Sequence, residues 1–286
     1  MITRPTILFF LIASLTGSAF AEEPDSISLP KGLVLDLDAD RGVTANEEKR
    51  VTLWENQVAG AMGKDFVPQD KGRKELGSGR PTLRESIGDL NGHNALVFRQ
   101  QELVCMDEDA YDALTQGGGC TWLCVLSVYE QRIGLRNVNC FFGNLKNGGN
   151  YEGLWGNLTD DNQLWWGVRN GVTFGRFDEN NPQLLGEKLE NGRFYVVAGR
   201  MAAGTGKVKL EIFTNSARPT NSVEIQVNPE ANPSKMAVGQ ERDAFEHPGR
   251  ESFDGEIARL LVFDRPLDSG ELAGLVAELH TYYGLR

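Results

Sequence analysis

Short segments in which apolar and polar residues alternate run through most of the chain. Val208, Leu210 and Ile212 alternate with lysine and glutamate, and residues 223–227 repeat this pattern. Successive side chains of a strand point to opposite faces, so a period of two predicts a strand with one buried and one solvated face. Residues 194–198 are apolar on both faces, which predicts a central strand. We expect further strands at residues 33–37, 51–54, 95–98, 121–129, 140–142, 151–155, 163–168, 236–238 and 256–263.

Turn-forming residues separate these segments at short intervals. Clusters of glycine, asparagine and aspartate occupy residues 147–149, 159–162 and 170–171. Many short strands with regular turn signals are typical of an antiparallel sandwich or barrel. The sequence contains no linker, internal repeat or low-complexity tract, and about 250 residues is an ordinary length for one such domain. We therefore expect residues 22–286 to form a single all-β domain, a two-sheet antiparallel β-sandwich.

One helix is predicted at the C-terminal end. Asp268 and Glu271 have the spacing of a capping box, and Gly284 can terminate the helix. Between them, apolar residues recur at helical spacing: Leu272, Leu275, Val276, Leu279 and Tyr283. We expect this amphipathic helix to lie against the sandwich.

The first 21 residues have the pattern of an export signal. Arg4 precedes an apolar run at residues 7–15, and Ala19-Phe20-Ala21 is a small-x-small cleavage pattern. The run is short for a membrane anchor, which needs roughly 20 apolar residues. We expect cleavage after Ala21 and a location outside the cytoplasm, either secreted or in the periplasm and cell envelope.

The net charge of −11 argues against two classes of partner. An acidic surface repels phosphate groups, and the sequence has no basic stripe that would overcome this repulsion. We therefore expect neither nucleic acid nor an anionic membrane surface as a partner. After removal of the signal, no second apolar run is long enough to form a transmembrane segment.

Four cysteines follow the signal: Cys105, Cys120, Cys124 and Cys140. No C-x-x-C motif is present, which argues against zinc ribbons and thioredoxin-like chemistry. Cys120 and Cys124 lie on one predicted strand, about 13 Å apart and too far to bond to each other. One disulfide from another pairing, or four free buried thiols, both remain open.

Motifs near the two ends of the chain together resemble a known family. The N-terminal motifs are GLVLDLDADRGV at residues 32–43, VTLWENQ at 51–57, RPTL at 80–83 and NGHNALVF at 91–98. The C-terminal motifs are FDGEIA at 253–258, LVFDRPL at 261–267 and YGL at 283–285. Their order resembles the laminin-G-like, concanavalin-A-like lectin and glucanase domains of bacterial exported proteins.

This resemblance implies a jelly roll of two stacked antiparallel sheets in which the first and last strands are close together. It does not imply one function, because such domains include sugar binders, adhesion modules, calcium-assisted binders and glucanases. The sequence departs from the pattern at Asp36, where an aromatic residue is common. The first strand is therefore a poor candidate for a sugar-stacking platform.

An aromatic cluster is the strongest indication of a binding site. Trp165 and Trp166 are neighbours on one predicted strand and so point to opposite faces. Leu164, Trp166 and Val168 form a plausible core face, which leaves Trp165 exposed on the other. An exposed tryptophan beside polar groups can stack on a sugar ring while those groups bind its hydroxyls. The candidate ligand-binding residues are Tyr151, Trp155, Gln163, Trp165 and Arg169.

A catalytic alternative rests on Glu241, Asp243 and Glu246. Their E-x-D-x-x-E spacing resembles that of glucanases of this superfamily, in which one glutamate attacks the anomeric carbon, the aspartate tunes it and the other glutamate protonates the leaving oxygen. In those enzymes the motif lies on a strand. Here it follows Val238-Gly239-Gln240 and carries Arg242 where an apolar residue is usual. These features favour a solvated loop, and binding is favoured over catalysis.

Acidic groups offer possible calcium ligands, but none has EF-hand spacing. The groups are Asp36, Asp38 and Asp40; Asp160 and Asp161; and Glu241, Asp243, Glu246 and Glu251. The three histidines are far apart in the sequence and show no metal spacing. Calcium binding is therefore open, and we predict neither a metal site nor a cofactor.

The leading hypothesis is a non-catalytic extracellular module that binds a glycan or another cell-surface polymer on a shallow open face. The first alternative is a glucanase-type glycoside hydrolase that uses Glu241, Asp243 and Glu246. The second is a structural or adhesive envelope protein without a small ligand.

Overall fold

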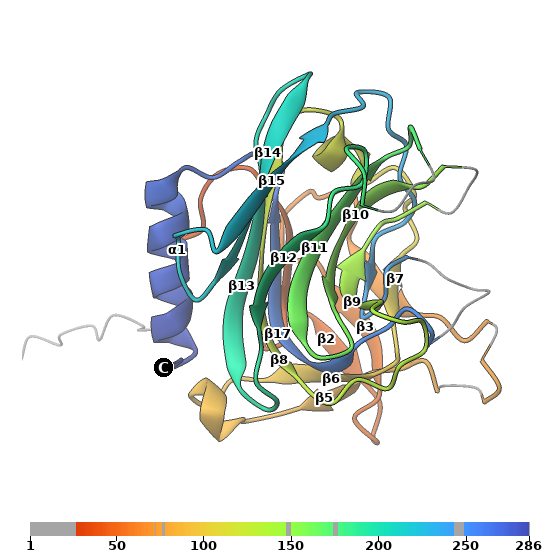
Figure 1. Ribbon diagram of the computed structural model, residues 1–286. Coiled ribbons are helices and arrows are strands. Elements are labelled where there is room, and N and C mark those ends of the chain that lie inside the picture. The colour runs from red at the N-terminus through yellow and green to blue at the C-terminus, as the bar shows by residue number, and fades with distance from the viewer. Residues whose placement is uncertain are drawn as a thin grey trace, which may run out of the picture.

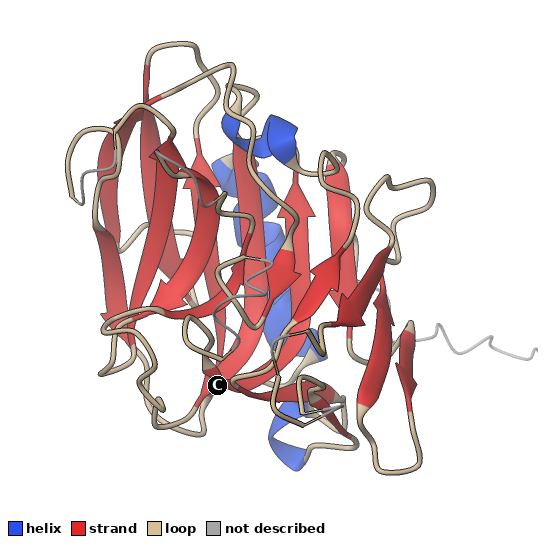
Figure 2. Ribbon diagram, turned by 90° about the vertical axis from the view of Figure 1, so that its right-hand side faces the viewer, coloured by secondary structure: helices blue, strands red, loops and turns tan. Residues whose placement is uncertain are grey.

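Two antiparallel β-sheets stack face to face, and one α-helix lies on the outside (Figures 1 and 2). This computed structural model describes residues 27–71, 73–75, 78–146, 150–173, 177–242 and 249–285. The all-β sandwich with a C-terminal helix predicted from the sequence is confirmed. The expected signal segment lies outside the described residues.

The eight-stranded sheet contains the first and the last strand of the fold. Its hydrogen-bonded order is β15 (Asn221–Gln226), β14 (Lys207–Thr214), β13 (Phe194–Met201), β8 (Cys120–Val128), β17 (Asp254–Phe263), β6 (Ala95–Arg99) and β5 (Thr82–Arg84), and β1 (Leu33–Asp38) pairs with β17. The pairing of β1 with β17 confirms that the first and last strands are neighbours.

The nine-stranded sheet faces the first. Its order is β12 (Leu184–Lys188), β11 (Gln163–Asn170), β10 (Glu152–Leu158), β9 (Asn139–Gly143), β16 (Ala237–Val238), β7 (Leu103–Cys105), β4 (Asp65–Pro68), β3 (Val51–Glu55) and β2 (Val43–Ala45). Two 3₁₀ helices, η1 (Gly88–Leu90) and η2 (Asp112–Thr115), lie in connections.

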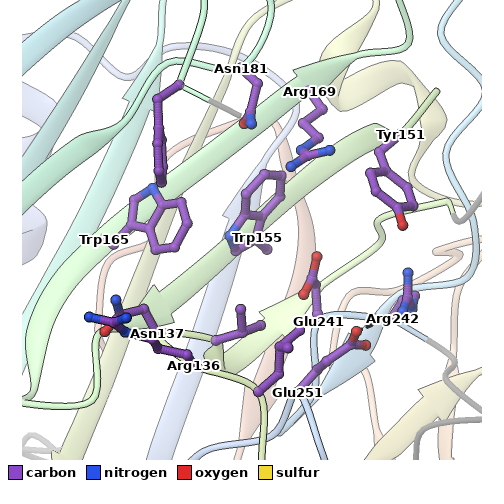
Figure 3. Close-up of a pocket in the computed structure, with 13 residues that line it drawn as sticks. Arg136, Asn137, Tyr151, Trp155, Trp165, Arg169, Asn181, Glu241, Arg242 and Glu251 are labelled. Atoms are coloured by element: carbon purple, nitrogen blue, oxygen red, sulfur yellow. Dashed lines mark hydrogen bonds and ion pairs between the residues drawn. The ribbon is translucent and has the colours of Figure 1, made fainter. Parts of the chain in front are cut away.

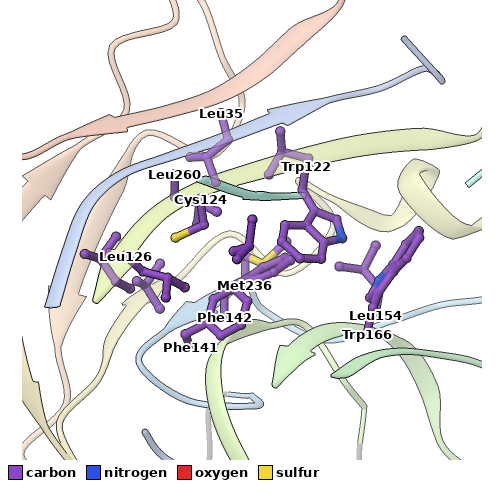
Figure 4. Packing of buried hydrophobic residues seen from close by; sticks show 14 of the residues in the cluster. Leu35, Trp122, Cys124, Leu126, Phe141, Phe142, Leu154, Trp166, Met236 and Leu260 are labelled. Atoms are coloured by element: carbon purple, nitrogen blue, oxygen red, sulfur yellow. The ribbon is translucent and has the colours of Figure 1, made fainter. Parts of the chain in front are cut away.

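Large aromatic side chains fill the space between the sheets (Figure 4). Trp122 of β8 packs edge-on against Trp166 of β11 and Phe142 of β9, with ring centroids 5.9 Å and 5.2 Å apart. Burying one such ring stabilises the fold by about 1.5–3 kcal/mol. These contacts connect the two sheets and fix which face of β11 is turned inward.

The helix α1 (Ser269–Tyr282) covers the outer face of the eight-stranded sheet, as expected. Its buried residues Leu272, Leu275 and Leu279 pack against Val125 of β8 and Val196 of β13. The predicted capping box is also present. The Asp268 carboxylate accepts from the backbone N–H groups of Gly270 and Glu271, and the Glu271 carboxylate accepts from the N–H of Asp268.

Replacing Glu271 with glutamine is expected to weaken the acid dependence of stability. Hydrogen bonds from Arg265 and from the Asp268 N–H lower the pKa of Glu271 from 4.5 to about 2. A lowered pKa in the folded state means that this stabilisation is present above pH 4.5 and is lost as the pH falls towards 2. The free energy of unfolding, measured by urea titration, should therefore fall less over this window in Glu271→Gln.

The control is Glu187→Gln, which removes an exposed carboxylate of β12 that forms no ion pair with a described residue. A parallel decline of both variants and the wild type with acid would contradict the assignment.

All four cysteines are buried free thiols. This outcome selects one of the two alternatives that the sequence left open. Burial raises the pKa of the Cys124 and Cys140 thiols well above the ordinary value, so neither is a ready nucleophile. Within the described ranges, no helix is long and apolar enough to cross a membrane.

Candidate functional site

The outer face of the nine-stranded sheet has a small apolar cluster of its own. Its buried members are Val138, Cys140, Leu145, Trp155 and Trp165, and they are separate from the core between the sheets. A cavity of about 210 Å³ opens beside this cluster (Figure 3). The helix covers the outer face of the other sheet, so the pocket lies on the opposite side of the sandwich from the helix.

The register of β10 and β11 brings the two tryptophans of the pocket together. Trp155 pairs with Gly167, and Trp165 pairs with Asn157, so both indoles emerge on the outer face. Their ring centroids are 6.0 Å apart, with the planes at 76°. A Cβ at Gly167 would clash with the indole of Trp155, so the absence of a side chain there is what allows this ring to lie on the sheet.

Arg169 extends the same face of β11 towards Tyr151. Its guanidinium carbon lies 4.7 Å from the ring centroid of Tyr151 and 5.8 Å from that of Trp155. A guanidinium over an aromatic face is held by cation–π attraction. The pocket therefore combines aromatic surface with a positioned fork of N–H donors (Figure 3).

Two carboxylates, Glu241 and Glu251, line the other side of the pocket. Arg242 donates from Nη2 to Oε1 of Glu251 over 2.7 Å, and both side chains of this pair are buried. Oε2 of Glu251 is buried and has no hydrogen-bond partner among the described residues. The pocket thus offers acceptors opposite the aromatic and guanidinium groups.

The sequence predicts that Glu241 lies in a solvated loop. For the described residues of this segment, that prediction is wrong. Glu241 is only 9% exposed, because residues 239–242 run along β9. The Gly239 N–H donates to the Phe141 carbonyl over 2.7 Å, and the Leu145 N–H donates to the Glu241 carbonyl over 3.3 Å. Gly143 makes this approach possible, since a Cβ there would clash with the Glu241 carbonyl. Asp243 and Glu246 lie outside the described residues.

Four of the five candidate ligand-binding residues share the pocket: Tyr151, Trp155, Trp165 and Arg169. Gln163 is not among the residues that line it; its Nε2 donates to the Gly186 carbonyl of β12 over 3.0 Å. The expected exposure of Trp165 is also wrong, because this residue is 7% exposed. Residues 135–138 and Phe177, from two connecting loops, also line the pocket and wall in this part of it.

Sequence reasoning missed most of the walls of the pocket. The additional lining residues include Arg136, Asn137, Phe177, Asn181, Arg242 and Glu251. The sequence indicates Glu251 only as a possible calcium ligand. These residues come from connections after β8, β11 and β16, and no local pattern in the sequence links them.

The acidic group on β1 is neutralised by arginine. Asp36 accepts two hydrogen bonds of 2.8 Å from Arg259, and Asp38 accepts bonds of 3.0 Å and 2.8 Å from Arg41. This pairing gives a physical reason for an aspartate at position 36. Within the described ranges, no group of three or more His, Cys, Asp or Glu side chains is arranged to hold a metal ion.

Comparisons with known proteins support the fold and do not identify a family. No family model matches the chain, and no curated protein matches it. The solved structure of Trypanosoma rangeli sialidase in complex with sialic acid is similar, with a TM-score of 0.52 and 13% identity over 89% of this chain. The same sialidase in complex with 2,3-difluorosialic acid gives a TM-score of 0.52 and 14% identity. The chain spans 34% of each sialidase chain, and at this identity the likeness concerns the fold alone.

Proposed function

We propose that the protein is a non-catalytic glycan-binding module whose pocket holds one sugar ring. The observation that supports this most strongly is that Trp155, Trp165, Arg169 and Glu241 line one pocket. The apolar face of a sugar ring packs on aromatic surface. Its hydroxyl groups can both donate to carboxylates and accept from guanidinium N–H groups. A pocket with all three kinds of partner suits a sugar better than a purely apolar or purely charged ligand.

The size of the pocket favours the end of a glycan over its interior. A volume of about 210 Å³ is below the roughly 300–1,000 Å³ of ordinary small-molecule pockets. This walled cavity replaces the shallow open face expected from the sequence. We infer that a terminal sugar enters the pocket and that the rest of the chain leaves through its mouth.

Two further features support an extracellular glycan as the ligand. The first 21 residues have an export pattern, and the acidic charge of −11 disfavours nucleic acid. The proposed location is therefore secreted or in the periplasm and cell envelope. We also propose that the sandwich is a concanavalin-A-like domain, the family that its motifs resemble. Because two similar solved structures are sialidases with sialic acid or its difluoro derivative, sialylated glycans belong among the probes.

A glycan microarray tests the proposal directly. We expect the wild-type protein to bind a defined set of glycans and Trp165→Ala to lose this binding while it keeps its circular dichroism spectrum. The matched control is Met62→Ala, which removes an exposed side chain from the β3–β4 connection, outside the pocket. A wild-type protein that binds no glycan would favour the structural or adhesive alternative.

Hydrolysis is the second candidate, and one observation favours it: Glu241 and Glu251 line the same pocket. Glycosidases of the usual kind use a pair of carboxyl groups next to the scissile bond. Glu251 could take the part that the sequence assigned to Glu246. Release of reducing sugar from β-glucans by the wild type, and its loss in Glu241→Gln, would establish this activity. Binding without any release would exclude it for those substrates.

A further inference from the structure

Two of the exposed large apolar side chains among the described residues line the pocket. Among the described residues, six large apolar side chains are exposed: Met62, Met106, Ile133, Leu135, Val172 and Phe177. Leu135 and Phe177 line the pocket, and Ile133 and Val172 belong to the same two connections, β8–β9 and β11–β12. Exposed apolar side chains at the opening of a pocket are typical of a binding surface.

Phe177 combines this exposure with an unusual backbone. Its φ angle is +61°, in the left-handed region that non-glycine residues rarely adopt. Its side chain is 52% exposed, so burial of the ring does not explain the conformation. Residues in such sparsely populated regions cluster at binding sites, where the surrounding structure holds them in place.

The ring of Phe177 extends the aromatic surface of the pocket outward. Its centroid lies 5.7 Å from that of Trp165, with the planes tilted by 50°. Trp165 is almost completely buried and Phe177 is half exposed, so the two rings lead from the interior of the pocket to its mouth. A chain whose terminal ring sits beside Trp165 would pass over Phe177 as it leaves.

We propose that Phe177 forms a second subsite, which binds the penultimate sugar of a glycan whose terminal sugar occupies the pocket. This inference rests on the proposed function. The occupant is a second sugar ring because the platform is continuous with the pocket and is a single aromatic ring. The apolar face of that ring packs on phenylalanine, and its hydroxyls remain in water.

The experiment compares glycans of different length by isothermal titration calorimetry. The probes are glucose to cellotriose, N-acetylglucosamine to chitotriose, xylose to xylotriose, and N-acetylneuraminic acid with its lactose conjugate. In the series that binds, we expect the disaccharide to bind about 5–10-fold more tightly than the monosaccharide, as for one added aromatic contact. The trisaccharide should add little.

Phe177→Gly is the decisive variant, because glycine adopts positive φ without strain and the fold should be retained. It should abolish the gain of the disaccharide over the monosaccharide; because Phe177 also lines the pocket, any loss of monosaccharide affinity should be smaller than the loss of disaccharide affinity. Phe177→Trp should restore the gain from chain length, and Met62→Ala should not alter it.

Equal binding of mono- and disaccharide by the wild type would overturn the second subsite and leave the proposed function intact. An equal loss for both sugars in Phe177→Gly would also overturn it. No binding of any probe would overturn both proposals.

Discussion

Gly167→Ala is expected to weaken glycan binding on the order of 100-fold, the loss typical of a binding hot spot. A methyl group at this position would clash with the indole of Trp155, and in a strand neither partner can move far. The indole must swing off the sheet into the space that the sugar would occupy. The variant removes no binding group, so a large effect would come from the position of Trp155. The measurement is titration calorimetry with the glycan that gives the strongest microarray signal.

The matched control for this variant is Gly206→Ala in the β13–β14 hairpin, where no described atom lies within 4 Å of the added Cβ. The control should bind as the wild type does. Overpacking at Gly167 also costs about 1–3 kcal/mol of stability, so binding must be measured well below the unfolding transition. Binding of Gly167→Ala within a factor of three of the wild type would show that Trp155 is not part of the site.

Arg259→Met is expected to lower the free energy of unfolding by about 3–5 kcal/mol, the usual cost of breaking a buried ion pair. Arg259 is 3% exposed and donates two hydrogen bonds of 2.8 Å to Asp36. Burial alone would lower the pKa of Arg259, but the hydrogen bonds and charges of Asp36 and Asp38 outweigh it, and the pKa is raised. Without the guanidinium, two carboxylates that are shielded from water lose the partner they share.

Urea unfolding of Arg259→Met at neutral pH measures this loss. The control is Lys188→Met, which breaks the ion pair between Lys188 and Asp161. Both side chains of this pair are exposed. Pairs of that kind contribute at most about 1 kcal/mol. If both variants lost the same small amount, the β1–β17 ion pair would not be an important part of the fold.

The period of two gave correct faces for most strands but no position along them. It separated Trp165 from Trp166 correctly, because alternation alone determines which side chains turn towards the core. It placed Gln163 with Trp165 on the same ground. Gln163 is the first residue of β11, two residues before Trp165, and its side-chain amide donates to the Gly186 carbonyl of β12 instead of reaching the pocket. Alternation therefore indicates a face, and only the register indicates a site.

The walls of the pocket were beyond the reach of local patterns. Glu241 and Glu251 lie in the connection between β16 and β17. Asn137 and Phe177 belong to two other connections, β8–β9 and β11–β12. Glu241 reaches the pocket because Gly143 admits residues 239–242 alongside β9, a contact between segments about a hundred positions apart in the sequence. The capping box of α1 was predictable for the opposite reason, since its partners are three residues apart.

The five tryptophan indoles provide the most direct test of the central claim that the outer face of the nine-stranded sheet holds the sugar. Trp54, Trp122 and Trp166 are buried in the core between the sheets, whereas Trp155 and Trp165 line the pocket. In a titration of ¹⁵N-labelled protein with the best microarray glycan, the indole N–H signals of Trp155 and Trp165 should shift and the other three should not. Saturable binding that leaves both of these signals unmoved would contradict the account.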